Sequence, residues 1–243
     1  MKSYLSELDT MRFGFKIAKV NNFDCPPNEL IQKLKADGIK MIISRVECEK
    51  IQLIHQLEEL NFLTMDFQII YKYDLEKYSI NEKKIESDFI VREAKTADIE
   101  MLVQIAKESF EFYGHYFADK RLAQKKCMEI YMDWIKRSCE SKEIADIVFV
   151  AEKEKEIGGF LSFKLNNDKS LYAAGVQGAV SLKFRNQNIF RLLALQGLIW
   201  GVNKGCKWEE HNVLVTNYPV NRSFLSIGFK PYKSFITMHC WLD

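Results

Sequence analysis

The residue types best suited to acid–base chemistry and to binding a polar ligand gather in one short segment, FYGHYFADKR, at 112–121. A sugar nucleotide needs such a mixture, because its base packs on aromatic rings, its diphosphate attracts cations and its hydroxyls require hydrogen bonds. His115 is the candidate general base or amine-positioning group, since much of an imidazole population is neutral near pH 7. A surface or helix-capping histidine is the alternative. The residues expected to bind this substrate are Tyr113, His115, Tyr116, Asp119 and Lys120.

A second candidate site lies at 180–192, where the strand-like VSLKF runs into RNQNIF and a long apolar helix. Backbone N–H groups at a helix N-terminus, with the positive end of the helix dipole behind them, bind phosphate or pyrophosphate. An ordinary polar turn with a helix cap is the alternative for RNQNIF taken by itself. The choice between the two depends on the surrounding elements.

The elements that must position these residues follow from the spacing of apolar side chains. A charge-dense stretch, Asp74–Asp88, in which 8 of 15 residues are charged, predicts a linker after the first third of the chain. Gly38 is the expected C-terminal cap of the first helix. The first third predicts strand, helix, strand, helix and strand, at 13–20, 27–38, 40–46, 50–62 and 64–73.

The remaining two thirds predict a strand, two helices, three strands, and then helix, strand, helix and strand. Thr96 or Asp98 is the expected N-cap of the first of these helices. The second helix carries Tyr131 and Trp134 on an apolar face, so both are predicted to be core residues. The expected ranges after these helices are 146–154, 156–166, 173–184, 189–206, 208–216, 220–228 and 233–242.

This order of elements and the junction resemble the GNAT superfamily of acyl-CoA-dependent acyltransferases, whose signature is Arg/Gln-x-x-Gly-x-Gly/Ala. Arg185 matches the first position, Asn188 stands for the first Gly and Phe190 for the small residue. Asn tolerates a left-handed backbone, so Asn188 can hold the turn, whereas the ring of Phe190 has to point into the core. The resemblance implies an α/β (α+β) GNAT fold, a mixed central sheet flanked by helices. It also implies acetyl-CoA as cofactor, held by Val180, Leu182, Arg185, Asn186, Gln187, Asn188, Ile189, Phe190 and Arg191.

The segment TNYPVNRSFLSIGF resembles the family's Asn-x-x-Ala-x-x-x-Tyr-x-x-x-Gly-Phe pattern, with Asn217 and Gly228–Phe229 matching. The resemblance adds Asn217 and Phe224 to the expected cofactor contacts. Many relatives use the Tyr of this pattern to protonate the departing CoA thiolate, but Phe224 stands there and has no proton to give. Tyr218 is therefore predicted to be catalytic together with His115. Ser223 and Tyr232 are further candidates, and a structural role for each hydroxyl is the alternative.

A longer resemblance covers most of the chain. LDTMRFGFKIAKV is similar to the opening of a two-domain GNAT subgroup, the TDP-fucosamine acetyltransferases, with Asp9, Phe13, Gly14 and Ala18 matching. The segment 108–139 is similar to that subgroup's aromatic, His/Arg-rich loop and the Tyr-x-x-Trp-Ile that follows. The resemblance implies a partial GNAT-like α/β domain over 1–78 and a GNAT acyltransferase domain over 79–243.

Composition excludes several other classes of protein. The 243 residues carry a net charge of +2, so no global field favours nucleic acid or a membrane surface. No apolar run approaches the ~20 residues of a membrane-spanning helix and no signal-peptide pattern is present, so we expect a cytoplasmic protein without membrane insertion. The six cysteines form no CxxC pair and the four histidines lack metal-ligand spacing, so no metal is expected. Glu209 and Glu210 are predicted to be solvated turn charges, and His239 a hydrogen-bonded strand residue.

The sequence thus predicts an N-acetyltransferase that moves an acetyl group from acetyl-CoA to the amine of a nucleotide-linked amino-deoxysugar. The substrate is expected to be of the dTDP-4-amino-4,6-dideoxyhexose type, made for surface polysaccharide. Another small amine or a peptide N-terminus is the alternative acceptor. A CoA-binding protein without catalysis is the alternative class, favoured by Asn188, Phe190 and Phe224. The sugar, the position of its amine, the acyl length and the oligomeric state, a homodimer included, are left open.

Overall fold

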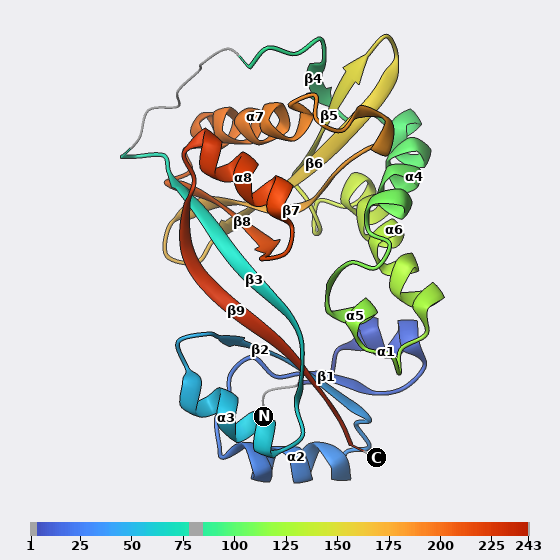
Figure 1. Ribbon diagram of the computed structural model, residues 1–243, viewed down its shortest axis with the longest axis vertical. Helices are drawn as coiled ribbons and strands as arrows, with labels where there is room; N and C mark the ends of the chain where they lie inside the picture. The colour runs from blue at the N-terminus through green and yellow to red at the C-terminus, as the bar shows by residue number, and fades with distance from the viewer. Residues whose placement is uncertain (1–3, 78–84, 243) are drawn as a thin grey trace. The chain divides into compact units, whose positions relative to one another are not determined.

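The computed structural model describes residues 4–77 and 85–242, whose helices and strands are labelled in Figure 1. The chain forms two compact units. The first comprises the residues up to Ile69, Phe112–Cys127 and the residues from Lys233 on, and the second comprises Ile70–Glu111 and Met128–Tyr232. The strands β3 (Leu63–Asp74) and β9 (Lys230–Trp241) contribute to both. The predicted boundary at 78/79 and the middle of the charged linker lie outside the described residues, and the predicted domain division stays a prediction.

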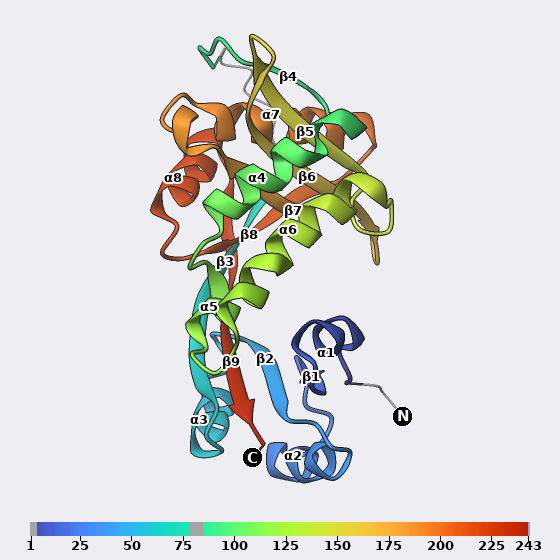
Figure 2. The same ribbon diagram turned by 90° about the vertical axis from the view of Figure 1, so that its right-hand side faces the viewer.

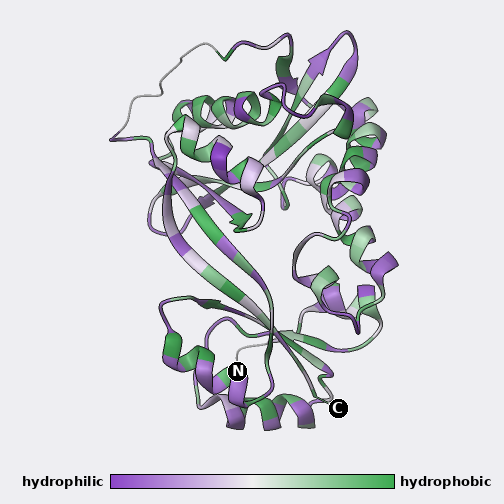
Figure 3. Ribbon diagram, viewed as in Figure 1, coloured by the Kyte–Doolittle hydropathy of each residue, from purple (hydrophilic) through white to green (hydrophobic). Residues whose placement is uncertain are grey.

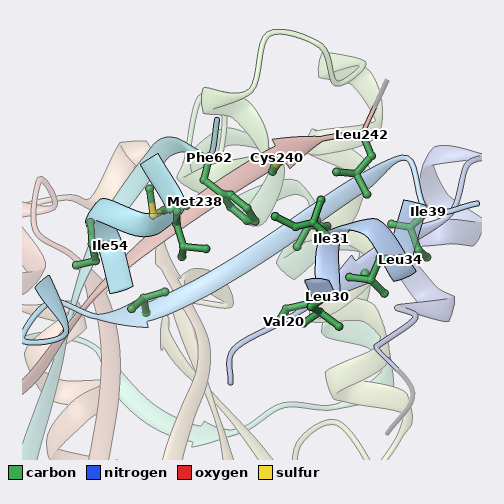
Figure 4. Packing of buried hydrophobic residues seen from close by; sticks show 14 of the residues in the cluster. Val20, Leu30, Ile31, Leu34, Ile39, Ile54, Phe62, Met238, Cys240 and Leu242 are labelled. Carbon is green, nitrogen blue, oxygen red and sulfur yellow. The ribbon is translucent and has the colours of Figure 1, made fainter. Parts of the chain in front are cut away.

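In the first unit the strands follow the order β1-β2-β9-β3. The strand β1 (Ile17–Lys19) is parallel to β2 (Met41–Glu47), and β2 is antiparallel to β9. The helices α2 (Pro27–Ala36) and α3 (Ile51–Glu59) bury apolar side chains against these strands. Figure 4 shows Leu30, Ile31 and Leu34 of α2 in one cluster with Met238 and Cys240 of β9. The structure thus confirms the helices predicted over 27–38 and 50–62 and the strand predicted over 40–46.

The prediction is wrong at two short helices. The helix α1 (Glu7–Phe13) ends at Gly14, whose φ of 82° stops the helix, and the strand predicted over 13–20 is reduced to β1. The helix α5 (Gly114–Ala118) lies in the segment predicted to be a loop. Helices of seven and five residues are not stable by themselves, so tertiary contacts decide whether they form. Such a contact joins them here, since the Tyr116 hydroxyl donates to Asp9 Oδ1 at 3.0 Å.

In the second unit the strands follow the order β3-β8-β7-β6-β5-β4. The strands β4 (Ile90–Glu93), β5 (Ile147–Lys153), β6 (Glu156–Asn167) and β7 (Leu171–Val180) pair antiparallel in succession. The strand β8 (Trp208–Leu214) is parallel to β7. The result is the mixed sheet that the sequence predicts.

Helices cover both faces of this sheet. Figures 1 and 2 show α4 (Ile99–Ser109) and α6 (Gln124–Glu140) on one face, with α7 (Ile189–Asn203) and α8 (Tyr218–Ile227) on the other. Apolar residues dominate α7 (Figure 3), and Leu193, Ala194 and Leu198 are fully buried, as expected for a helix that is hydrophobic nearly all round. Within the described residues, no helix has the length and apolar character needed to cross a membrane.

Two predicted details of these helices have different outcomes. The N-cap residue of α4 is Asp98, which is the last residue of a short 3₁₀ turn at Thr96–Asp98 and accepts the Lys95 N–H at 2.7 Å. On α6, Tyr131 is buried as predicted, but Trp134 is 37% exposed, so its assignment to the core is wrong. The helical period places both rings on the same face of α6, but the part of that face that carries Trp134 is partly exposed.

Candidate functional site

An unpaired strand edge is the first part of the candidate site. The parallel strands β7 and β8 pair only where Tyr172–Ala174 lie beside Trp208–Glu210. Beyond these residues β7 continues to pair with β6, as far as Val180 beside Gly159. From Gly175 to Val180, β7 therefore has one side on which the described part of β8 provides no ladder partner. A ligand with extended amide groups can pair with such an edge.

The loop that follows this edge leads into α7. Asn186 and Asn188 have φ values of 65° and 60°, in the left-handed region, so the prediction that Asn188 holds an unusual turn is confirmed. The Asn188 side chain caps no backbone N–H of the first turn, and Arg185–Asn188 are exposed. The N–H groups at the start of this 15-residue helix thus face an open loop, with the dipole of the helix behind them. This is the geometry of an anion site.

The remaining predicted cofactor residues border these two features. The ring of Phe190 meets that of Phe224 edge-on, with 5.2 Å between centroids, so it points away from the loop as the prediction required. The Val180 carbonyl accepts the Ser109 hydroxyl at 3.3 Å, and Leu182 is exposed. Asn217 caps α8 by accepting the Val220 N–H at 3.4 Å.

Phe224, at the position of the family's acid, and Tyr218, the residue predicted to replace it, differ in exposure. Phe224 is 1% exposed and packs against Tyr71, Phe229 and the ring of His211. Tyr218, the first residue of α8, is 64% exposed.

Sequence reasoning missed a buried carboxylate–imidazole pair on β8. Glu209 is fully buried, so its prediction as a solvated turn charge is wrong. Its Oε1 lies 2.7 Å from Nε2 of His211, which is also buried. Burial raises the pKa of Glu209, and the hydrogen bond to His211 opposes this only in part. A signal was present, because Glu209, His211 and the buried Val213 alternate along one strand and so share one face.

The His211 ring occupies the point where β7 and β8 part. A methyl group placed on Gly175 would lie 1.9 Å from His211 Nδ1 and 2.3 Å from its Cε1, so only glycine leaves room for this ring. The ring centroid is 4.5 Å from that of Phe224 and 5.6 Å from that of Phe163. The unpaired edge of β7 therefore begins beside an imidazole.

In the first unit, the side chains of Asp119, His239 and His115 form a chain of hydrogen bonds. Asp119 Oδ2 lies 2.8 Å from His239 Nδ1, and His239 Nε2 lies 2.8 Å from His115 Nδ1. All three side chains are buried. His239 is thus a hydrogen-bonded strand histidine, as predicted, and it also links the two candidate residues His115 and Asp119.

The protonation of this chain follows from the environments of its ends. Burial alone would raise the pKa of Asp119, but donors from His239, the Arg121 N–H and Trp241 Nε1 together lower it. Burial, together with the nearby His239, lowers the pKa of His115 well below its ordinary value. With Asp119 ionised, His239 Nδ1 donates to Asp119, and a neutral His115 keeps one ring nitrogen with a lone pair.

The other residues of the predicted substrate segment separate into buried and exposed groups. Tyr116 is buried with its hydroxyl on Asp9, which also pairs with Lys19 at 2.6 Å. Tyr113 is half-buried at the N-cap of α5, and Lys120 is exposed. The structure therefore brings together His115, Tyr116 and Asp119 in a buried network and leaves Lys120 at the surface. No group of His, Cys, Asp and Glu side chains that could hold a metal ion occurs in the described part of the chain.

Comparison with known proteins identifies the fold. No family model matches the sequence, and no curated protein sequence matches it. The tandem GNAT protein of the clavulanic acid biosynthesis pathway superposes with a TM-score of 0.65 and 11% identity, over 94% of this chain and 76% of that one. A GCN5-related N-acetyltransferase from Kribbella flavida gives 0.63 and 12%, over 92% and 80%. A functionally unknown conserved protein from Staphylococcus epidermidis gives 0.61 and 12%, over 94% and 85%.

The chain therefore has the fold of the GNAT acetyltransferases, which confirms the predicted fold class. Identities of 11–12% show the fold alone. The particular amino-sugar subgroup predicted from the sequence stays a prediction.

Proposed function

We propose that this protein transfers an acetyl group from acetyl-CoA to an amine, and that the second unit binds the acetyl-CoA. The observation that carries the proposal is the parting of β7 and β8 just before the loop at the start of α7. The pantetheine arm of CoA is an extended chain with two amides, so it can pair with the open edge of β7 as another strand would. Its pyrophosphate suits the N–H groups that precede and begin α7.

The residues that would hold acetyl-CoA are those predicted from the sequence. Val180 ends the open strand, Leu182 begins the 3₁₀ turn after it, and Arg185–Arg191 form the loop and the first turn of α7. N–H groups on the β7 edge can donate to the thioester carbonyl, where negative charge develops during acyl transfer. The protein contributes mainly position and polarisation, because a thioester is already activated.

We propose further that the acceptor is a nucleotide-linked amino-deoxysugar bound by the first unit. The Asp119–His239–His115 chain supports this role, because burial favours the neutral form of His115, which has a lone pair. A neutral imidazole can take the proton that the acceptor amine loses. Tyr113 and Lys120, at either end of α5, are proposed contacts for the base and the diphosphate.

Release of free thiol tests the activity. Acetyl-CoA should be offered with a panel of dTDP- and UDP-linked 3-amino and 4-amino deoxysugars, peptides and polyamines. We expect turnover with one or more of the sugar nucleotides and none with the others. Turnover only with a peptide or a polyamine would retain the acetyltransferase and refute the sugar. No binding of acetyl-CoA in calorimetry at millimolar concentration would refute the whole proposal.

Two substitutions separate the two ligands. Arg185→Gln should weaken acetyl-CoA ~5- to 10-fold by removing a charge from the phosphate loop, and Lys204→Gln, at the other end of α7, is its control. His115→Ala should leave acetyl-CoA affinity within about 3-fold and lower turnover with the sugar nucleotide by ~10². A His115→Ala variant with full turnover would show that the proton leaves through water.

A further inference from the structure

The buried Glu209–His211 pair is not used by the function proposed above. A pair serving stability alone would be an unfavourable choice, because a well-packed apolar pair of similar volume is usually as stable or more so. Glu209 Oε1 contacts His211 Nε2, while Glu209 Oε2 is buried and has no hydrogen-bond partner within the described part of the chain. The cost of burying these groups therefore calls for another explanation.

The position of the pair suggests that explanation. His211 is the first residue of β8 beyond the three that pair with β7, and its Nδ1 faces Gly175, the first unpaired residue of β7. An acyl group carried along the open β7 edge would therefore pass this nitrogen. The ring beside it, Phe224, has no proton to give.

The protonation of the pair makes Nδ1 a donor. A carboxyl group with a single partner in a fully buried site keeps a proton between itself and that partner. Whether this proton is closer to Oε1 or to Nε2, His211 then carries its other proton on Nδ1. Both neutral arrangements of the pair thus present an N–H toward β7.

We propose that His211, backed by Glu209, is the proton donor to the leaving CoA sulfur. The inference rests on the proposed function and deepens it. The amine nitrogen forms its bond to the acetyl carbon, the C–S bond breaks and its electron pair goes to sulfur. Sulfur takes the proton from His211 Nδ1, and the shared proton settles on Nε2 opposite the Glu209 carboxylate. The proton that the amine nitrogen loses passes through the general base proposed above to water, and a proton from water restores the pair.

Binding of CoA and of desulfo-CoA, which lacks only the sulfur, tests the contact without requiring turnover. A donor to the sulfur should make wild-type protein bind CoA ~3- to 10-fold more tightly than desulfo-CoA, the usual scale for a hydrogen bond between neutral groups. In His211→Asn this ratio should fall to about 1, while the affinity for desulfo-CoA stays within about 3-fold. The same ratio in both proteins would overturn the proposal. If wild-type protein binds neither compound, the proposed function fails and this inference with it.

A variant at Glu209 tests the same proposal even if His211→Asn does not fold. Glu209→Gln keeps the shape and removes the ionisable group, and Glu210→Gln, on the same strand and bonded to Trp208 instead, is the matched control. We expect Glu209→Gln to lower the CoA preference and the kcat for thiol release ~10-fold, with KM for acetyl-CoA nearly unchanged and a shifted pH–rate profile. Glu210→Gln should match wild type. Equal behaviour of the two variants, both folded by circular dichroism, would overturn the role of Glu209.

Discussion

Adding one methyl group at Gly175 should displace the His211 ring and thereby destabilise the second unit. In Gly175→Ala the new carbon would lie 1.9 Å from His211 Nδ1, far inside van der Waals contact. The ring cannot rotate away freely, because Glu209 holds its Nε2 at 2.7 Å and Phe224 packs against its face. The substitution must therefore break the hydrogen bond, shift the backbone, or do both.

The expected cost combines two contributions. Overpacking of a buried site costs ~1–3 kcal/mol, and separating the buried carboxylate from its partner adds a comparable amount. We expect Gly175→Ala to lower the free energy of unfolding by about 4 kcal/mol. His211→Ala removes the same hydrogen bond and leaves a cavity, which should cost about 3 kcal/mol.

The double variant distinguishes this explanation from a general defect at Gly175. Without the ring there is no clash, and the added methyl group fills part of the cavity, so the double variant should be no less stable than His211→Ala. The coupling energy should be about 4 kcal/mol in magnitude, slightly above the ~0.5–3 kcal/mol usual for residues in contact. Urea unfolding followed by circular dichroism measures all four proteins. Additive losses, or a Gly175→Ala variant within ~0.5 kcal/mol of wild type, would refute the reasoning.

A matched glycine provides the control. A methyl group on Gly205 would meet no atom within 4 Å, and its φ of 73° is the sole source of strain. Gly205→Ala should therefore cost only about 1 kcal/mol and show no coupling to His211→Ala.

Variants at two further positions, Asn188 and Asp9, test features that position the sites. Asn188→Ala should lower the free energy of unfolding by about 1 kcal/mol, because alanine fits a φ of 60° less well than asparagine, whereas Asn188→Gly should be nearly neutral by thermal denaturation. Burial opposes the ionisation of Asp9, but Lys19, Ser6 and Tyr116 lower its pKa below 3.8, so its contribution is present above that pH and is lost as pH falls through the folded-state pKa. Asp9→Asn should remove this loss between pH 5 and pH 2 in urea unfolding, and an unchanged pH dependence would contradict it.

The sequence predicted the elements whose stability is local in origin. The amphipathic spacing of α2, α3 and α4 and the buried runs of β2 and β5 identify them without reference to the rest of the fold. The helices α1 and α5 were missed because side chains far apart in the sequence, Asp9 and Tyr116, stabilise them. Local spacing carries no information about such a bond.

The same distinction applies to the candidate site. The left-handed turn at Asn188 could be predicted, because residue type alone determines which side chains tolerate it. The burial of Glu209 was missed because the adjacent charged pair Glu209–Glu210 is typical of a turn. The alternation of side chains along the predicted strand carries the missing signal, since it assigns Glu209 to the buried face and Glu210 to the opposite one.

The pKa values of Asp119 and Glu209 shift in opposite directions for a reason that is visible in their hydrogen-bond donors. Asp119 receives hydrogen bonds from His239, Trp241 and the Arg121 N–H, so its charged form is favoured and its pKa falls. Glu209 has one hydrogen-bond partner, His211, and its other carboxylate oxygen is buried without a partner among the described residues. Burial therefore dominates and raises the pKa of Glu209. An ionised carboxylate accepts a hydrogen bond from the imidazole beside it, and a protonated carboxyl group donates to its imidazole, whose other nitrogen then carries a proton. Acyl transfer from a thioester to an amine is assisted by a base for the amine and by an acid for the thiolate. The surroundings of Asp119 and of Glu209, each within its own unit, thus support the base proposed at His115 and the acid proposed at His211.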